Sequence, residues 1–129
     1  MELLEITATD ESPEIRFDLN KGLLEINGKS LPEDVKAFYQ PLERAVNTYI
    51  SNPLPVTNIM FKLSYINSAS TKKILEILSH FENFAKKGFK VNLFWYYKEN
   101  DEDMKEEGEE FSRLTDLTLN MVVYKERLL

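Results

Sequence analysis

The segment from residue 56 to residue 87 constrains the fold most, because a strand pattern in it is followed at once by a helix pattern. Residues 56–66 (VTNIMFKLSYI) alternate, which places Ile59, Phe61, Leu63 and Tyr65 on one face. Residues 70–87 then repeat apolar side chains at helical spacing and end at Lys86-Lys87-Gly88, a typical helix C-terminus. A strand that leads into a helix predicts an α/β fold with parallel strands and right-handed connections.

The remaining strand patterns lie on both sides of this segment. Residues 14–19 (EIRFDL) and 23–27 (LLEIN) alternate around Asn20-Lys21-Gly22, which predicts a β-hairpin. Residues 90–97 (KVNLFWYY) and 117–124 (LTLNMVVY) are rich in β-formers and predict two further strands.

Two more helices complete the pattern. Apolar residues recur at helical spacing from Val35 to Ile50, and Ser30-Leu31-Pro32-Glu33 predicts the start of that helix because proline suits the first helical position. Pro41 lies inside it, so we expect a kink or a later start, and Asn52-Pro53 predicts its end. The acidic segment 99–110 predicts a loop that opens a third helix.

The predicted order is β-β-α-β-α-β-α-β within a single domain, residues 1–129. It corresponds to a mixed β-sheet with an antiparallel N-terminal hairpin. The second face of 56–66 is mixed, with Lys62 and Ser64 between Met60 and Ile66, whereas a strand buried on both faces is apolar nearly throughout. We therefore expect the helices to pack mainly on one face of the sheet.

Composition excludes several classes of function. The chain has no cysteine and one histidine, His80, so we expect no thiol chemistry, no metal site and no cofactor. A net charge of −6 argues against binding to nucleic acid or to an anionic membrane. The start has no signal-peptide pattern and no apolar run is long enough to span a bilayer, which predicts a soluble cytoplasmic protein.

Residues 67–71 (NSAST) are the strongest candidate site, because they lie where the strand at 56–66 ends and a helix begins. Ligands of open α/β sheets bind at the carboxyl ends of strands, and the first turn of a helix stabilises negative charge. A phosphate on Ser68 would meet such an environment. The simpler interpretation is helix capping, for which Asn, Ser and Thr are all favoured. Local chemistry alone does not separate Ser68 from Ser70 as a phosphoacceptor.

Two enzymatic interpretations of this loop are weaker. A catalytic serine needs a base, but His80 lies twelve positions beyond Ser68, roughly 18 Å along a helix. The spacing of Ser70 and Lys73 is a weak match to a Ser-x-x-Lys pair. The four glycines form no phosphate-binding motif. Both interpretations therefore have little support from the residues of the loop.

The acidic residues of segment 99–110 fit a solvated helix face best. A docking surface for a basic partner is the main alternative, since the spacing and glycine position of a calcium loop are absent. Phe94, Trp95, Tyr96 and Tyr97 are interpreted first as residues that alternate between the core and the outer face of a strand.

Four segments carry a family resemblance: TATDESPEIRFDLNKGLLEINGKSLPED, FYQPLERAV, FKLSYINSASTKKIL and GFKVNLFWYYKENDEDMKEEGEEF. Together they resemble the SiaC family of regulatory phosphoproteins, which has a STAS-like fold similar to anti-sigma factor antagonists. The first segment resembles the family's N-terminal Thr-Pro strand, hairpin and approach to the first helix. The third resembles its Asn-[Ser/Thr]-Ser-Ser-x-Lys motif. This chain has Ser68 where other members have threonine, Ala69 in place of a hydroxyl residue, and Leu31 in place of an aromatic residue.

The resemblance implies a switch protein that is controlled by phosphorylation and is not an enzyme. Family members are phosphorylated by a cognate Ser/Thr kinase and dephosphorylated by a PPM-type phosphatase, and the unphosphorylated form binds and activates a diguanylate cyclase. It assigns the phosphoacceptor to Ser68. We expect Asn67, Ser70, Thr71 and Lys72 to form the surrounding contact surface, together with Tyr65. The alternatives are an anti-sigma factor antagonist in a partner-switching module and, from another class, a small anionic ligand binder or enzyme at the start of the second helix.

Overall fold

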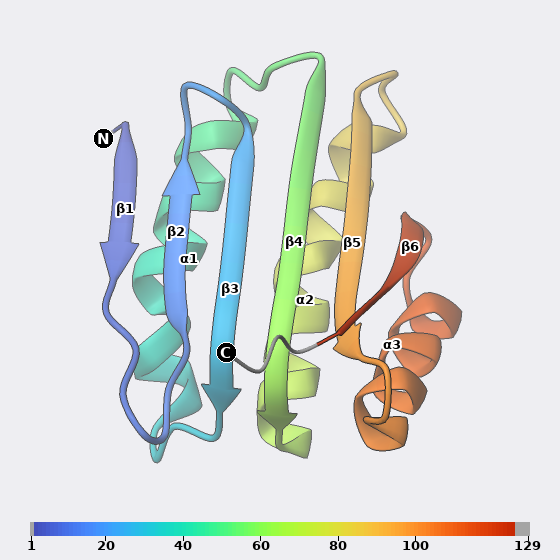
Figure 1. Cartoon of the computed structure of the whole chain (residues 1–129). Coiled ribbons are helices and arrows are strands. Elements are labelled where there is room, and N and C mark those ends of the chain that lie inside the picture. Colours follow the sequence, from blue (N-terminus) through green and yellow to red (C-terminus); the bar gives the residue numbers. More distant parts are fainter. Residues whose placement is uncertain (1, 126–129) are drawn as a thin grey trace.

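The computed structural model describes residues 2–125, which form six strands and three helices (Figure 1). In chain order the elements are β1 (Leu3–Ile6), β2 (Glu14–Asp18), β3 (Leu23–Ser30), α1 (Val35–Ile50), β4 (Val56–Ile66), α2 (Ser68–Ala85), β5 (Lys90–Lys98), α3 (Glu102–Leu114) and β6 (Thr118–Tyr124).

The strands form one sheet in the order β1-β2-β3-β4-β5-β6. The pairs β1–β2 and β2–β3 are antiparallel, whereas β3–β4, β4–β5 and β5–β6 are parallel. All three helices lie behind the same face of the sheet in Figure 1. The predicted mixed α/β sheet, with a hairpin at one end and helices on one face, is thus confirmed.

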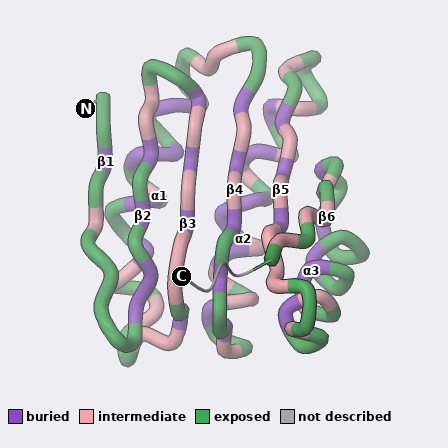
Figure 2. Tube along the Cα trace, viewed as in Figure 1, coloured by how far each residue is buried: buried purple, intermediate pink, exposed green. Residues whose placement is uncertain are grey.

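The core lies between the helices and the covered face of the sheet. Along β4 the side chains of Thr57, Ile59, Phe61 and Leu63 are buried, while Lys62 and Ser64 on the other face are exposed (Figure 2). The predicted alternation therefore assigns the buried and exposed side chains of β4 correctly over most of its length.

The alternation in β4 breaks at Ser64. Gly28 of β3 pairs with Leu63, but the next residue, Lys29, pairs with Tyr65, so Ser64 is an extra residue that forms a β-bulge. A bulge reverses the faces of the residues that follow it. Tyr65, predicted on the apolar face, is instead 48% exposed, and Ile66 takes the buried position.

The predicted start of the first helix is wrong. Ser30 is the last residue of β3 and fully buried, and α1 begins at Val35 with Asp34 as its N-cap, whose carboxylate accepts from the backbone N–H of Ala37 at 3.0 Å. The start is not delayed to Pro41 either. Pro41 lies within it, at an exposed position where the unpaired carbonyl of Ala37 can be hydrated.

Smaller differences concern the element ends. Strand β1 was missed because it has four residues and buries only Leu4. Residues 7–13, which open the segment that resembles the family's Thr-Pro strand and hairpin, form a loop. Helix α2 starts two residues before the predicted position, because Asn67 rather than a later hydroxyl residue caps it. The predicted strand at 56–66 and the third helix are confirmed.

Trp95 fixes α3 against the sheet. Its ring is buried, and its indole N–H donates to the Met104 carbonyl of α3 at 2.8 Å. Gly108 of α3 lies directly on this ring, where an added Cβ would come within 2.7 Å of Trp95 Nε1 and 2.8 Å of the Met121 methyl group. Only a residue without a side chain fits there.

We expect Gly108→Ala to destabilise the fold by about 1–3 kcal/mol, because neither the indole nor the helix backbone can retreat without loss of packing. Denaturant unfolding followed by the fluorescence of Trp95, the only tryptophan, measures the effect. The control is Glu109→Ala at the exposed neighbouring position, which should change stability by less than about 0.5 kcal/mol. Equal stability of the two variants would contradict this packing.

Candidate functional site

The start of α2 lies at the edge of the sheet where the parallel strands have their carboxyl ends (Figure 1). Asn67 connects β4 to the helix. Its backbone N–H donates to the Ser30 carbonyl of β3 at 3.0 Å, and its side-chain oxygen accepts from the Ser70 N–H at 2.9 Å. The expected capping role of this segment is therefore carried by Asn67, which leaves the hydroxyl groups for other functions.

Ser70 is not a surface residue, contrary to the sequence-based expectation. It is fully buried, and its hydroxyl oxygen accepts from the Ser30 hydroxyl at 2.8 Å. The Ser30 oxygen lies 2.6 Å from the Tyr39 hydroxyl of α1. Helical geometry explains the correction, since the inward-facing stripe of α2 that contains Ile74 and Ile77 begins at Ser70. In this conformation Ser70 can contact neither a kinase nor a partner.

The three hydroxyl residues of the loop therefore differ in environment. The Thr71 hydroxyl donates to the Asn67 carbonyl at 3.2 Å, and its residue is half-buried. Ser68 is the first residue of α2, is exposed, and has a hydroxyl that forms no hydrogen bond with any residue from 2 to 125. Structure thus separates Ser68 from Ser70 where local sequence chemistry did not.

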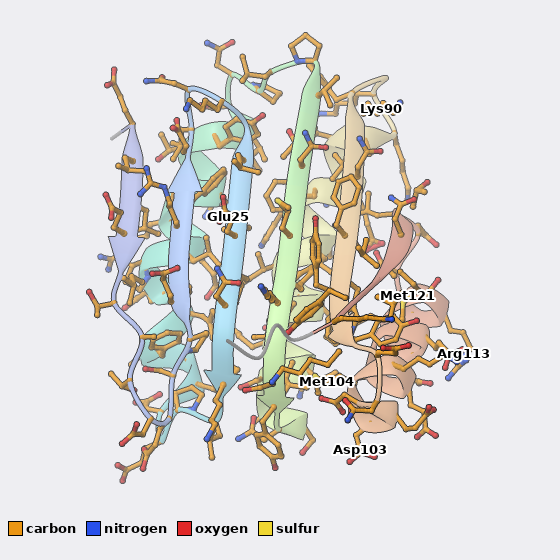
Figure 3. The ribbon with its side chains drawn as sticks, in the orientation of Figure 1. Glu25, Lys90, Asp103, Met104, Arg113 and Met121 are labelled. Carbon is orange, nitrogen blue, oxygen red and sulfur yellow. The ribbon has the colours of Figure 1, made fainter. Side chains whose placement is uncertain are left out.

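Tyr65 and α3 form the walls of a groove of about 550 Å³ beside this loop. The bulge at Ser64 turns Tyr65 outward, and the opposite wall is acidic. Figure 3 shows Asp103 and Met104 at the start of α3 and Arg113 near its end. The carboxylates that line the groove are Asp101, Asp103, Glu106, Glu107, Glu109 and Glu110.

Crowding of these carboxylates affects Glu107. Partial burial raises the pKa of Glu107, and the neighbouring charges of Glu110, Asp103 and Glu106 raise it further. The carboxylates on this face of α3 therefore repel one another at neutral pH. The sequence predicted an acidic helix face, but it gave no sign that Tyr65 stands opposite, because the bulge depends on pairing with Gly28 in a distant strand.

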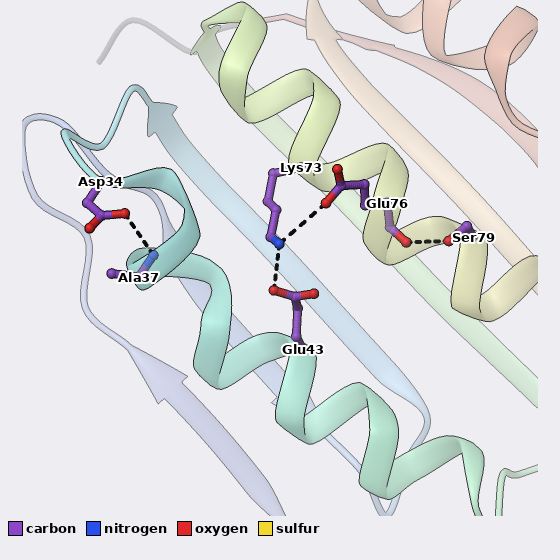
Figure 4. A network of polar contacts seen from close by, with 6 residues as sticks. All are labelled: Asp34, Ala37, Glu43, Lys73, Glu76 and Ser79. Atoms are coloured by element: carbon purple, nitrogen blue, oxygen red, sulfur yellow. Dashed lines mark hydrogen bonds and ion pairs between the residues drawn. The ribbon is translucent and has the colours of Figure 1, made fainter.

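Lysines lie on the other side of Ser68. Lys72 is exposed, whereas Lys73 points toward α1, where its ammonium group lies 2.7 Å from Glu43 and 3.4 Å from Glu76 (Figure 4). The hydrogen bond to Glu43 raises the pKa of Lys73. Neither lysine serves Ser70, whose hydroxyl is bonded to Ser30. The predicted weakness of the Ser70–Lys73 pair as a catalytic unit agrees with this geometry.

A second hollow, of about 640 Å³, lies on the uncovered face of the sheet. Its lining includes Glu25, labelled in Figure 3, and Lys62, whose ammonium group lies 4.6 Å from the centre of the Tyr124 ring. Among residues 2–125 no group of three or more acidic, histidine or cysteine side chains could hold a metal ion. In the same range no helix is long and apolar enough to cross a membrane.

The described residues thus form a small α/β domain that presents the exposed hydroxyl of Ser68 at a helix start, with an exposed tyrosine and an exposed lysine nearby in the sequence. Comparison with known families identifies the class of protein. The model for the SiaC family regulatory phosphoprotein matches residues 6–124, and the chain belongs to that family.

Solved structures show the same fold. In a crystal structure of the diguanylate cyclase SiaD in complex with its activator SiaC from Pseudomonas aeruginosa, the matching chain is 26% identical, with a TM-score of 0.88 over 94% of this chain and 99% of that one. Apo-SiaC from the same organism is 25% identical with a TM-score of 0.86, over 95% and 99%. An uncharacterized protein of P. aeruginosa strain UCBPP-PA14 is 29% identical over 84% of this chain and 86% of its own length.

The buried hydroxyl groups of Tyr39, Ser30 and Ser70 predict that the free energy of unfolding depends on pH. Burial raises the pKa of Tyr39 to about 12, although its hydrogen bond with Ser30 lowers it in part. The unfolded chain loses this proton near pH 10, so stability falls as pH rises from about 10 to 12. We expect Tyr39→Phe to remove about 1 kcal/mol of this loss by pH 11, measured as the difference between urea unfolding at pH 8 and pH 11. An unchanged alkaline slope in the variant would contradict the prediction.

The acidic face predicts a gain of stability. Replacing Glu107 with Gln removes a partly buried charge among like charges, so we expect a gain of about 0.5 kcal/mol at pH 7. Because the pKa of Glu107 is raised, protonation relieves the same repulsion as pH falls through that pKa, and the gain should vanish near pH 4. Urea unfolding at both pH values measures it. A loss of stability at pH 7 would show that Glu107 is stabilising instead.

Proposed function

We propose that this protein is a phosphorylation-controlled activator of a diguanylate cyclase. In the proposed cycle the unphosphorylated form binds and activates the cyclase, a Ser/Thr kinase modifies Ser68, and a PPM-type phosphatase restores the active form. Membership of the SiaC family supports this proposal, as does the likeness to SiaC, which is described as the activator of SiaD.

The main support for the proposal is that Ser68 is exposed and that its hydroxyl group forms no hydrogen bond with any residue from 2 to 125. Its hydroxyl lies at the first position of α2, where the helix presents unpaired N–H groups and partial positive charge. Helices α1 and α3 already place the carboxylates of Asp34 and Asp101 at their N-caps, and α3 has further acids in its first turn. Helix α2 has a neutral cap and no acid in its first turn, so a phosphate on Ser68 would be the first negative charge at the N-terminus of this helix.

The contact surface follows from the exposed residues around Ser68. Tyr65 is an exposed aromatic side chain, a type enriched at protein interfaces, and Lys72 is an exposed cation. We assign partner contact to Tyr65, Ser68 and Lys72. The half-buried Asn67 and Thr71 shape this surface, since their side chains hold the first turn of α2 in place.

The phosphate acts by blocking this surface. The first turn of α2 is fixed by the Asn67 cap and by the buried bond between Ser70 and Ser30, so modification of an outward hydroxyl leaves the fold intact. Phosphorylation adds about 1.5 to 2 negative charges. To reverse a 99:1 preference for the bound state takes about 5.5 kcal/mol, which an unpaired charge buried in an interface can supply.

Ser68→Asp tests this function against Ser68→Ala. We expect the alanine variant to capture a partner that makes cyclic di-GMP from GTP, and the aspartate variant to capture at least tenfold less, because the added charge lies in the interface. Pull-down from the native cell with an assay of cyclase activity in the captured fraction is the measurement.

The matched control is Ser79→Asp, which adds the same charge at an exposed position three turns along α2 and should bind like the unmodified protein. If both aspartate variants lose the partner, total charge and not position 68 is responsible. If the captured partner is a kinase-bound sigma regulator without cyclase activity, the output is partner switching instead.

A further inference from the structure

We propose that Lys72 forms an ion pair with the phosphate on Ser68, and that this pair withdraws Lys72 from the partner surface. The pair presupposes the phosphate proposed above and adds a second consequence to it. Modification then adds negative charge at position 68, and it also neutralises the positive charge of Lys72, which a partner can no longer contact.

Helix geometry places the two residues together. Ser68 and Lys72 are both in α2 and are four residues apart, so they lie one above the other on the same side of the helix, with Cβ atoms about 6 Å apart. An acidic group that precedes a lysine by four residues has the more favourable of the two orientations. A lysine side chain spans that distance without any change in the backbone.

Lys72 is the cation in this part of α2 that no carboxylate engages among residues 2–125. Its neighbour Lys73 has a side chain that is only 13% exposed and lies between Glu43 and Glu76, so its charge is already matched. Lys72 is exposed and engaged by no carboxylate among the residues that the structure describes. A phosphate on Ser68 therefore has no carboxylate to displace from the ammonium group of Lys72.

Lys29 of β3 is exposed and pairs with Tyr65 near the start of α2, and Lys36 of α1 lies at the same end of the helix pair. With Lys72, Lys73 and Ala69, Lys36 lines a hollow of about 260 Å³ between α1 and α2. Ala69, not Ser68, borders this hollow, so Lys36 faces the neighbouring position. Among residues 2–125 the charged groups near position 68 include Lys72, Lys73 and Glu76 on α2, Lys36 and Glu43 on α1, Lys29 on β3, and the acids of the α3 groove beyond Tyr65.

The test is a ³¹P NMR titration of the 129-residue chain with phosphoserine incorporated genetically at position 68. The second pKa of phosphoserine is about 6 in isolation, and an adjacent cation lowers it by favouring the dianion. We expect Lys72→Gln to raise that pKa by about 0.3 unit, and Lys72→Arg to leave it unchanged. Lys36→Gln is the matched control and should shift it by less than a third as much.

An unchanged pKa in Lys72→Gln would overturn the ion pair, and a larger shift in Lys36→Gln would assign the phosphate to α1. Because the phosphoserine is built in, the titration gives the same answer whether or not a cellular kinase modifies Ser68. A normal shift with no phosphate found in cells would refute the proposed switch alone.

Discussion

The buried hydrogen bond between Ser30 and Ser70 determines how this site is presented. It joins the last residue of β3 to the first turn of α2, and Tyr39 extends the connection to α1. With Ser70 held inward, helical geometry turns Ser68 outward. A loop rich in hydroxyl groups thereby exposes Ser68 to solvent while Ser70 stays buried.

Charge is distributed unevenly around that hydroxyl group. The chain has a net charge of −6, and the acids of α3 lie on one side of Tyr65, whereas Lys72 and Lys36 lie on the other side of the loop. A phosphate on Ser68 would extend the acidic region across the loop and neutralise part of the basic one. A single modification can therefore change the surface that a partner meets while the core, which lies beneath, keeps its packing.

Much of the fold could be predicted because its signals are local. The alternation in β4 and the apolar stripe of α2 each follow from residues close in sequence. The outward turn of Tyr65 could not be predicted in this way, since the bulge at Ser64 depends on a register shift opposite Gly28 and Lys29. Ser30 was misplaced for a similar reason. A serine before proline is a common helix start, and only the distant partners Tyr39 and Ser70 make it a buried strand residue. For the candidate site, sequence and resemblance point to the loop at 67–71, and only the structure shows that Ser70 is buried beneath its surface.

Peptide mapping of the protein isolated from its native cells, by mass spectrometry, tests the central claim most directly. We expect the mass of one phosphate group on Ser68 in a fraction of molecules that changes with growth conditions, and none on Ser70 or Thr71. A phosphate found on Ser70 would contradict the buried arrangement of that hydroxyl. A chain that carries no phosphate under any condition would refute control by phosphorylation.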